Sequence, residues 1–371
     1  MASSAFPSRV AVVLGGGGLK GFAHIGVLRA LKERGIRPAL YAGTSIGALI
    51  AAARAAGISL DEMDARARAL QKQDLFRINH LAMLLERMKS PSLYHEEPLR
   101  ELCRLNAPNG TFEDLRVPLL VNTVDVEHGT RVVWGLPGLR NVKVEDAIYA
   151  SCALPGFFPP GIVGERPCID GGTIDNLPAA IAGLGAEMVI AVDVGTTSLG
   201  HARLIRRQGF AAIYMRAASI MMHALQLQPL ASWSGPPMLL IRPDVAHRDM
   251  FSFVHTEELI EAGYDATIAA LDQVADHELK PGVIYPRRRV NVLVDRGKCT
   301  GCGICVSLAP DRIVLDLANK AVIANPVMEW SPADGDFVQQ CPFEAISVHS
   351  LDGTKRTTRP ISQPMAVSPN D

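Results

Sequence analysis

Residues 9–26 read RVAVVLGGGGLKGFAHIG, and this stretch decides how the first part of the chain folds. The apolar, β-branched run 10–14 predicts a buried strand, whereas residues 22–31 carry apolar side chains at helical spacing and predict a helix. The four glycines between them therefore form a strand-to-helix turn. Such a turn directs backbone N–H groups and the positive end of a helix at the space above it, which predicts an anion site.

Three classes of glycine loop compete for this stretch. Gly16, Gly18 and Gly21 match the G-x-G-x-x-G pattern of dinucleotide-binding folds, but those folds place an acidic residue about twenty positions further on. Here residues 41–45 read YAGTS. A Walker-type phosphate loop needs Ser or Thr after Gly-Lys, and Lys20 is followed by Gly21. Neither nucleotide pattern is complete.

The end of the second predicted strand carries a nucleophile elbow, G-x-S-x-G. Ser45 stands between Gly43 and Gly47, and the alanine-rich helix expected over 46–56 is closed by Gly57. Loop and elbow each lie between a strand and a helix in adjacent βα units, and parallel sheets gather ligand sites at the carboxyl ends of their strands. The pair predicts an oxyanion hole that faces an activated serine.

Composition limits the classes of function. A chain of 371 residues with 48% hydrophobic content is long enough for one large domain and a small one. The 37 basic and 38 acidic residues balance, so nothing indicates a nucleic-acid partner. No signal peptide and no apolar stretch of about 18 residues is found, which predicts a cytoplasmic protein. Peripheral contact with the inner membrane face remains open.

The rest of the first part favours an α/β fold. Residues 117–126 and 131–134 predict two strands joined by a turn, and residues 186–194 predict another buried, parallel-type strand. The stretch 75–89, LFRINHLAMLLERMK, alternates apolar and basic residues at helical spacing. It is interpreted either as a helix docked on the sheet or as an amphipathic cover over the serine that makes transient contact with a membrane surface.

Several blocks now resemble one family. They are GGGGLKG (15–21), AGTSIGAL (42–49), SCALPGFFPP (151–160), DGGTIDNLP (170–178), IRPD (241–244) and ELIEAGYDA (258–266). Over roughly residues 8–286 the chain resembles the patatin-like phospholipases, bacterial lipid acyl hydrolases related to the catalytic domain of neuropathy target esterase. The resemblance implies a three-layer α/β/α fold with a mostly parallel central sheet, and a lipid acyl ester as substrate.

The resemblance also implies a Ser-Asp dyad in place of a triad. Ser45 would be the nucleophile and Asp170 its base, since a carboxylate can serve when its site raises its proton affinity. The glycines of the Asp-Gly-Gly motif and the residues of the oxyanion loop complete the expected site: Gly171, Gly172, Gly16, Gly17, Gly18, Lys20 and Gly21. Many members of the family carry Arg at the position of Lys20, so a lysine keeps the charge but loses bidentate geometry.

The rival interpretation is an α/β-hydrolase with a catalytic histidine. The candidates would be His201, His223, His247 and His255, and none stands in a strand-end glycine turn like that of Asp170. We interpret them as surface or helix histidines.

The seven cysteines divide unevenly along the chain. An odd count without a signal peptide argues for a reducing compartment, and the scattered Cys103, Cys152 and Cys168 are expected to be buried thiols. The spacing Cys299-x-x-Cys302-x-x-Cys305 with a distant Cys341-Pro is the ferredoxin arrangement, which predicts one 4Fe-4S cluster. Zinc is the rival, although zinc sites usually pair two C-x-x-C knuckles.

Residues 290–350 resemble single-cluster bacterial ferredoxins, which implies a small α+β domain and a possible redox partner. A linker precedes this domain near residue 286, and the polar tail 351–371 is expected to be disordered. The cluster would be regulatory, electron-transferring or structural. The alternative from another class is an iron-sulfur electron carrier or scaffold with a vestigial hydrolase domain.

Overall fold

The computed structural model describes residues 6–77, 92–107, 109–195, 209–245, 248, 250–275 and 277–351. The chain forms two compact units, Met1–Pro286 and Arg287–Asp371. The expected amphipathic cover at 75–89 and the expected disordered tail at 351–371 lie, apart from residues 75–77 and Leu351, outside the described residues.

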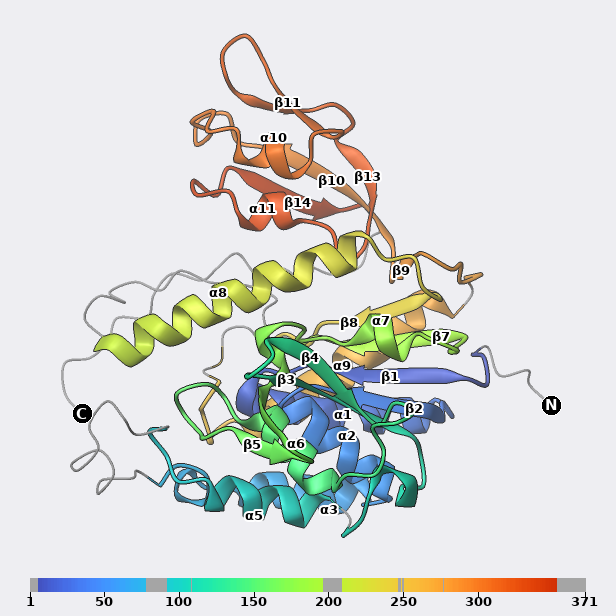
Figure 1. The fold of residues 1–371 in the computed structure, drawn as a ribbon. Helices are drawn as coiled ribbons and strands as arrows, with labels where there is room; N and C mark the ends of the chain where they lie inside the picture. The colour runs from blue at the N-terminus through green and yellow to red at the C-terminus, as the bar shows by residue number, and fades with distance from the viewer. Residues whose placement is uncertain are drawn as a thin grey trace. The chain divides into compact units, whose positions relative to one another are not determined.

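The first unit is built on a nine-stranded sheet with the order β5-β6-β3-β2-β1-β7-β8-β9, and β4 pairs with β3 off this path (Figure 1). The strands are β1 (Val10–Leu14), β2 (Pro38–Gly43), β3 (Leu119–Asp125), β4 (Thr130–Trp134), β5 (Gly161–Val163), β6 (Arg166–Asp170), β7 (Met188–Val192), β8 (Met238–Ile241) and β9 (Ile284–Tyr285). The six neighbouring strands β3, β2, β1, β7, β8 and β9 run parallel. An α/β class with a mostly parallel central sheet is thereby confirmed.

Antiparallel strands close one edge of this sheet. The two strands predicted over 117–126 and 131–134 are β3 and β4, whereas the sequence did not predict the pairing of β6 with β3 or the strand β5. β3 pairs antiparallel with both β4 and β6, and β6 pairs antiparallel with the three-residue β5. The register matters for the site, because Asp170 at the end of β6 lies opposite Thr123 of β3.

Helices cover both faces of the sheet. They are α1 (Ala23–Glu33), α2 (Ile46–Ala56), α3 (Leu60–Ala69), α5 (Glu97–Asn106), α6 (Val144–Cys152), α7 (Ala179–Ala182), α8 (Gly209–Ala231) and α9 (Thr256–Val274). Figure 1 shows α1, α2, α3 and α5 on one side of the sheet and α8 on the other. β1 and β7 are fully buried between the layers, as near-continuous apolar parallel strands must be.

Two glycines bring α1 and α9 together. A Cβ on Gly26 of α1 would lie 1.8 Å from the carbonyl oxygen of Ile260, and a Cβ on Gly263 of α9 would lie 1.9 Å from that of Ala23. Only residues without side chains allow the two backbones to approach this closely. The last long helix of the unit is therefore held directly against the helix that follows the glycine loop.

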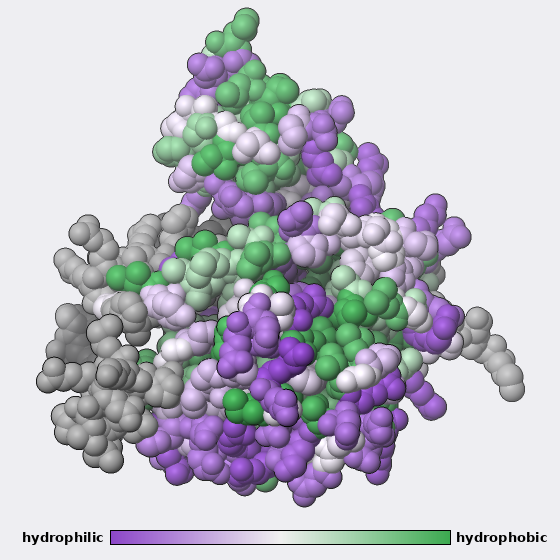
Figure 2. Space-filling view, viewed as in Figure 1, coloured by the Kyte–Doolittle hydropathy of each residue, from purple (hydrophilic) through white to green (hydrophobic). Residues whose placement is uncertain are grey.

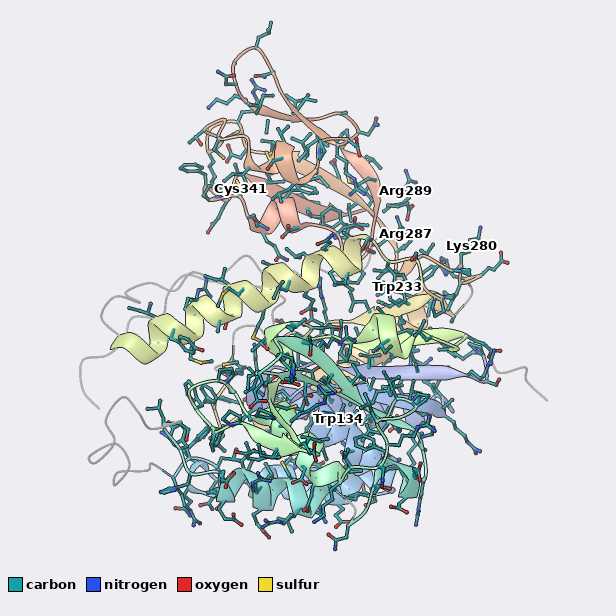
Figure 3. The ribbon with its side chains drawn as sticks, in the orientation of Figure 1. Trp134, Trp233, Lys280, Arg287, Arg289 and Cys341 are labelled. Carbon is teal, nitrogen blue, oxygen red and sulfur yellow. The ribbon has the colours of Figure 1, made fainter. Side chains whose placement is uncertain are left out.

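α8 is apolar on more than one face. Its outer face exposes Ile213, Ile220, Met221 and Leu225, and green surface follows this helix in Figure 2, whereas the region of α3 and α5 is purple. Within the described residues, no helix combines the length and apolarity needed to cross a bilayer. Trp233 follows α8 and donates its indole N–H to the carbonyl oxygen of Pro236 at 2.9 Å (Figure 3).

The second unit is a small antiparallel structure. β10 (Arg288–Val294) pairs with β13 (Val327–Trp330) on one side and β14 (Ile346–Ser350) on the other, while β11 (Ile313–Leu315) and β12 (Ala321–Ile323) form a separate two-stranded sheet. The short helices α10 (Ile304–Leu308) and α11 (Asp336–Gln339) complete it. Trp330 and Phe337 meet edge to face in its core with ring centroids 5.9 Å apart.

Candidate active site

Ser45 lies on a sharp turn between β2 and α2, in a backbone conformation (φ 55°, ψ −129°) that is unusual for a residue with a side chain. The flanking glycines make the turn feasible. A Cβ on Gly43 would lie 2.6 Å from the carbonyl oxygen of Gly47, and a Cβ on Gly47 would lie 2.0 Å from that of Leu14. The G-x-S-x-G spacing is therefore required by backbone packing, and the strain is located at the residue with the reactive group.

A buried hydrogen-bond chain supports this turn from behind. The Ser45 amide donates to Oγ of Ser151 at 2.9 Å, and the Ser151 hydroxyl donates to the carbonyl oxygen of Asn122 at 2.7 Å. Ser151 is fully buried near the end of α6, and Asn122 is fully buried in β3. The chain couples the elbow to two elements that are distant in sequence.

Asp170 faces the serine from the end of β6. It is 3% exposed and accepts a hydrogen bond from the Gly172 amide at 2.8 Å. Burial raises the pKa of Asp170 from 3.8 to about 6, against the Gly172 amide and the neighbouring Ser45 hydroxyl, which both lower it. A carboxylate with this pKa is ionised at neutral pH yet retains enough proton affinity to act as a general base.

The Asp-Gly-Gly turn needs its first glycine for packing. A Cβ on Gly171 would lie 2.4 Å from the carbonyl oxygen of Asn122, so a side chain there would displace β3 or the turn. Asn122 in return donates its side-chain N–H to the carbonyl oxygens of Gly171 at 3.2 Å and Asp175 at 2.6 Å. The turn that presents Asp170 is thus fixed to the same strand as the elbow.

The glycine loop follows β1, and several of its amides already have partners. Gly15 N–H donates to the carbonyl oxygen of Val192 at 2.9 Å, and Gly16 N–H donates to that of Asn176 at 3.3 Å. The amides of Gly17 and Gly18 donate to no partner within the described part of the chain, so they remain available to a ligand. Gly18 has φ 60°, and a Cβ there would lie 2.4 Å from a backbone oxygen of Met250.

Lys20 and Gly21 hold the loop rather than face the cavity. The Lys20 ammonium is buried and donates to the carbonyl oxygen of Gly195 at 3.0 Å. A Cβ on Gly21 would lie 2.3 Å from the Ile46 side chain, the first residue of α2. The loop therefore packs directly on the elbow helix.

A buried histidine of α1 fixes the beginning of the loop. His24 Nε2 bonds the carbonyl oxygen of Gly15 at 2.8 Å. Burial lowers the pKa of His24 to about 4, so the ring is neutral at physiological pH and Nε2 donates in that bond. Sequence reasoning did not single out His24.

An apolar cavity of about 140 Å³ opens beside Ser45 and Asp170. Its apolar walls come mainly from the loop, α2, α3, α5 and α8, including Leu19, Leu49, Leu102, Met215 and Met222. Phe158, from the block SCALPGFFPP, also lines it. No histidine is found among the described residues that line the cavity.

The histidines of the rival triad are placed elsewhere or not described. His255 bonds Glu258 at 3.2 Å at the start of α9, and His223 is a buried residue of α8. His201 and His247 lie outside the described residues.

Cys152, at the end of α6, was expected to be an ordinary buried thiol. It is half-buried and lines the cavity. The neighbouring Cys103 and the desolvation of the thiol raise the pKa of Cys152 well above its usual range, against the Ser45 hydroxyl, which lowers it. It is a protonated neighbour of the serine that sequence reasoning missed.

The four ferredoxin-type cysteines come together in the second unit. Cys299, Cys302, Cys305 and Cys341 line one small cavity of about 10 Å³, and Figure 3 shows Cys341 beside α11. Gly301 and Gly303, with φ 76° and 79°, turn the backbone between the first three. No three metal-binding side chains of the described residues are arranged to hold a metal ion as they stand.

The donor set nevertheless fits an iron-sulfur cluster. Cluster sulfurs commonly accept backbone N–H groups, and Ala321 N–H and Ala345 N–H approach Sγ of Cys299 and Cys341 at 3.4 Å each. Four cysteines around one cavity, without a histidine or carboxylate among its lining residues, are the ligands that such a cluster needs.

Two family models match separate parts of the chain. Residues 12–182 match the model of the patatin-like phospholipase family, which supports a patatin-like phospholipase domain in the first unit. Residues 292–348 match the model of the 4Fe-4S single cluster domain, which suggests an iron-sulfur cluster in the second.

Individual relatives cover only part of the chain. An uncharacterized NTE family protein of Mycobacterium tuberculosis is 36% identical over 196 residues, which are 53% of this chain and 51% of that protein. Lysophospholipase NTE1 of Mycosarcoma maydis is 31% identical over 194 residues, 50% of this chain and 10% of that protein. The chain thus spans about half the length of the mycobacterial relative. The crystal structure of the type III effector ExoU aligns with a TM-score of 0.40 at 17% identity, over 73% of this chain and 54% of that one.

Proposed function

We propose that this chain is a serine hydrolase of lipid acyl esters, of the phospholipase or lysophospholipase type. The observation that carries the proposal is the placement of Ser45, on its strained turn, and the buried carboxylate of Asp170, whose pKa is raised to about 6, together on the wall of one apolar cavity. The family match over residues 12–182 and the likeness to lysophospholipase NTE1 support the same class of reaction.

In the proposed acylation step, Ser45 Oγ attacks the acyl carbonyl carbon and its proton passes to Asp170. The carbonyl oxygen becomes an oxyanion. It accepts hydrogen bonds from the amide N–H groups of Gly17 and Gly18, which lie at the positive end of the following helix. When the bond to the leaving alcohol breaks, its oxygen takes the proton from Asp170. The product is the free alcohol and an acyl ester on Ser45.

The proposed substrate follows from the cavity. Its walls are mostly hydrocarbon, and the methionines of α8 supply flexible contacts that accept chains of different shape. An acyl chain fits these walls, whereas a polar headgroup would lose its hydration there.

The test uses a fluorophosphonate probe and a medium-chain acyl ester with the full-length protein. Wild type should be labelled at Ser45, and Ser45→Ala and Asp170→Asn should each nearly abolish labelling and hydrolysis. Ser219→Ala is the matched control, because Ser219 lines the same cavity but bonds only the Met215 carbonyl in its helix. If Asp170→Asn kept most activity and a histidine substitution removed it, a triad would replace the dyad. Absence of labelling in folded wild type would favour the vestigial hydrolase.

We further propose transient contact with a membrane surface through the outer face of α8. The support is the row of exposed Ile213, Ile220, Met221 and Leu225, on the same helix that lines the cavity from inside. The pair of substitutions Met221→Ser and Leu225→Ser should weaken binding to phosphatidylcholine vesicles more than hydrolysis of a short soluble ester. Ile162→Ser on β5, which is also exposed, is the control and should change neither.

The second unit is proposed to hold one 4Fe-4S cluster on Cys299, Cys302, Cys305 and Cys341. Such a group gains or loses one electron when bound, so a redox partner or a sensing role would follow. The purified protein should be brown, with about four irons per chain, and the substitution Cys302→Ser should remove the colour. Ser307→Ala, an exposed residue of α10, should keep it. Retention of full iron content by Cys302→Ser would exclude this ligand set.

A further inference from the structure

One polar atom beside the dyad is left without a partner. The side-chain amide of Asn176 is 2% exposed and donates Nδ2–H to the carbonyl oxygen of Gly16 at 3.1 Å. That bond fixes the orientation of the amide, because a carbonyl oxygen can accept only from the nitrogen end. Its oxygen, Oδ1, has no hydrogen-bond partner within the described part of the chain.

The position of Oδ1 is defined by two glycines of the site. A Cβ on Gly172 would lie 2.9 Å from Oδ1 of Asn176 and 3.1 Å from Oδ1 of Asp170. A Cβ on Gly16 would lie 2.5 Å from the same Asn176 oxygen and 3.2 Å from Cβ of Ser45. The unpaired oxygen therefore adjoins both the base and the nucleophile.

This acceptor differs from the other unpaired buried groups. Asn122 Oδ1 and His24 Nδ1 are also unpaired, but their residues do not line the cavity. Among the unpaired buried groups of the described residues, only that of Asn176 belongs to a residue that lines the cavity. A buried acceptor without a donor is unfavourable, and the cavity is the route by which a ligand can bring one.

We propose that Oδ1 of Asn176 accepts a hydrogen bond from the water that attacks the acyl group on Ser45, and that it thereby favours hydrolysis over acyl transfer. The proposal rests on the proposed Ser45–Asp170 hydrolase. In this step the water oxygen bonds to the acyl carbon while one of its protons passes to Asp170. The bond between the acyl carbon and Ser45 Oγ then breaks, and Oγ takes that proton from Asp170. The second proton stays on the oxygen of the released acid.

Water suits this arrangement because it carries two protons. One is taken by Asp170, and the other remains available for Asn176 throughout the attack. A simple alcohol has one O–H, which must go to the base, so it leaves the Asn176 oxygen unpaired. A vicinal diol restores a donor through its second hydroxyl. The acyl group on Ser45 should therefore be transferred fastest to water, more slowly to ethylene glycol and most slowly to methanol, when each rate is divided by the number of hydroxyl groups.

The experiment follows a chromogenic medium-chain ester in water with added methanol or ethylene glycol, using the full-length protein. For Asn176→Ala we expect a burst of one product equivalent per active site and steady-state deacylation slower on the order of tenfold to hundredfold. The methyl ester to acid ratio should rise by a similar factor. Asn291→Ala is the matched control, because Asn291 Oδ1 is also buried without a partner among the described residues but belongs to β10 of the second unit.

Each outcome decides the matter. Equal slowing of fluorophosphonate labelling and of deacylation, with an unchanged product ratio, would mean that Asn176 only holds Gly16 and would overturn the proposal. If the variant does not fold, the wild-type acceptor panel remains decisive, because equal use of methanol and glycol per hydroxyl would also overturn it. Wild type that is not labelled at Ser45 would instead contradict the proposed function.

Discussion

Replacement of Asp170 by Asn should stabilise the folded protein while it destroys activity. Asp170 is 3% exposed, and burial raises its pKa from 3.8 to about 6. An asparagine side chain has the same shape and can still accept the hydrogen bond from the Gly172 N–H, but it carries no charge that burial would penalise. The folded state should therefore gain stability at every pH at which Asp170 would otherwise be ionised.

The raised pKa of Asp170 fixes the sign and the size of the stability difference between Asp170→Asn and wild type. Near pH 4 the folded carboxyl is protonated, and aspartate and asparagine should be nearly equivalent. As pH rises from about 4 to about 6, the unfolded state loses its proton first, so wild-type stability falls. Above pH 6 the loss is complete, and a shift of about two pH units corresponds to about 3 kcal/mol.

Urea unfolding of wild type and Asp170→Asn at pH 4 and pH 8, followed by tryptophan fluorescence, measures this difference. With a slope of about 3 kcal/mol per molar urea, the variant should unfold about 1 M later at pH 8 and almost together with wild type at pH 4. A variant that is less stable than wild type at pH 8, or whose difference does not change with pH, would refute the reasoning.

Asp125→Asn supplies a control of opposite sign. Burial alone would raise the pKa of Asp125, but hydrogen bonds from the His128 amide, the Arg166 guanidinium and the His128 ring outweigh it and lower the pKa to about 2. This substitution should therefore destabilise the protein at pH 8, and the difference should shrink in acid.

Three further predictions concern the same framework. Gly47→Ala should slow probe labelling of Ser45 on the order of a hundredfold, because its Cβ would lie 2.0 Å from the Leu14 carbonyl oxygen and displace the elbow. Gly297→Ala in the second unit is the control, and labelling of Gly47→Ala at the wild-type rate would contradict the prediction. Gly26→Ala should lower the free energy of unfolding by roughly 3 kcal/mol, since its Cβ would lie 1.8 Å from the Ile260 carbonyl oxygen, and an unchanged urea midpoint would count against that packing. Finally, kcat/KM should fall about tenfold per pH unit below pH 6, as the base becomes protonated, whereas a profile flat to pH 4 would mean that the base has an ordinary pKa.

The local parts of this fold could be predicted from the sequence. β1 over Val10–Leu14 and α2 over Ile46–Ala56, closed by Gly57, have the predicted bounds, because strand runs, helix periodicity and glycine caps act over a few residues. The apolar periodicity of residues 257–276 likewise predicts a helix, and α9 covers Thr256–Val274, within two residues at each end. The four cluster-type cysteines were also recognisable from spacing alone.

The support around the site could not be predicted in the same way. Ser151 bonds the Ser45 amide across 106 residues of sequence, and Asn176 holds Gly16 across 160. Such bonds depend on the strand order, and a lone serine or asparagine has no pattern that reveals its partner. β5 was missed because three residues show no alternation, and α5 was missed although Pro98 in its first turn is a start signal.

The pairing of β1 with β7 shows that the domain needs more of the chain than the family model matches. The family model ends at residue 182, yet β7, β8 and α9 all come later in the chain. β7 covers one edge of β1, and its last residue, Val192, accepts the Gly15 amide of the loop. A gene fragment that stopped at residue 182 would leave that edge of β1 bare and the loop without its partner. A duplicated or fused copy of this domain should therefore extend to about Pro286, about a hundred residues beyond the segment that the family model matches.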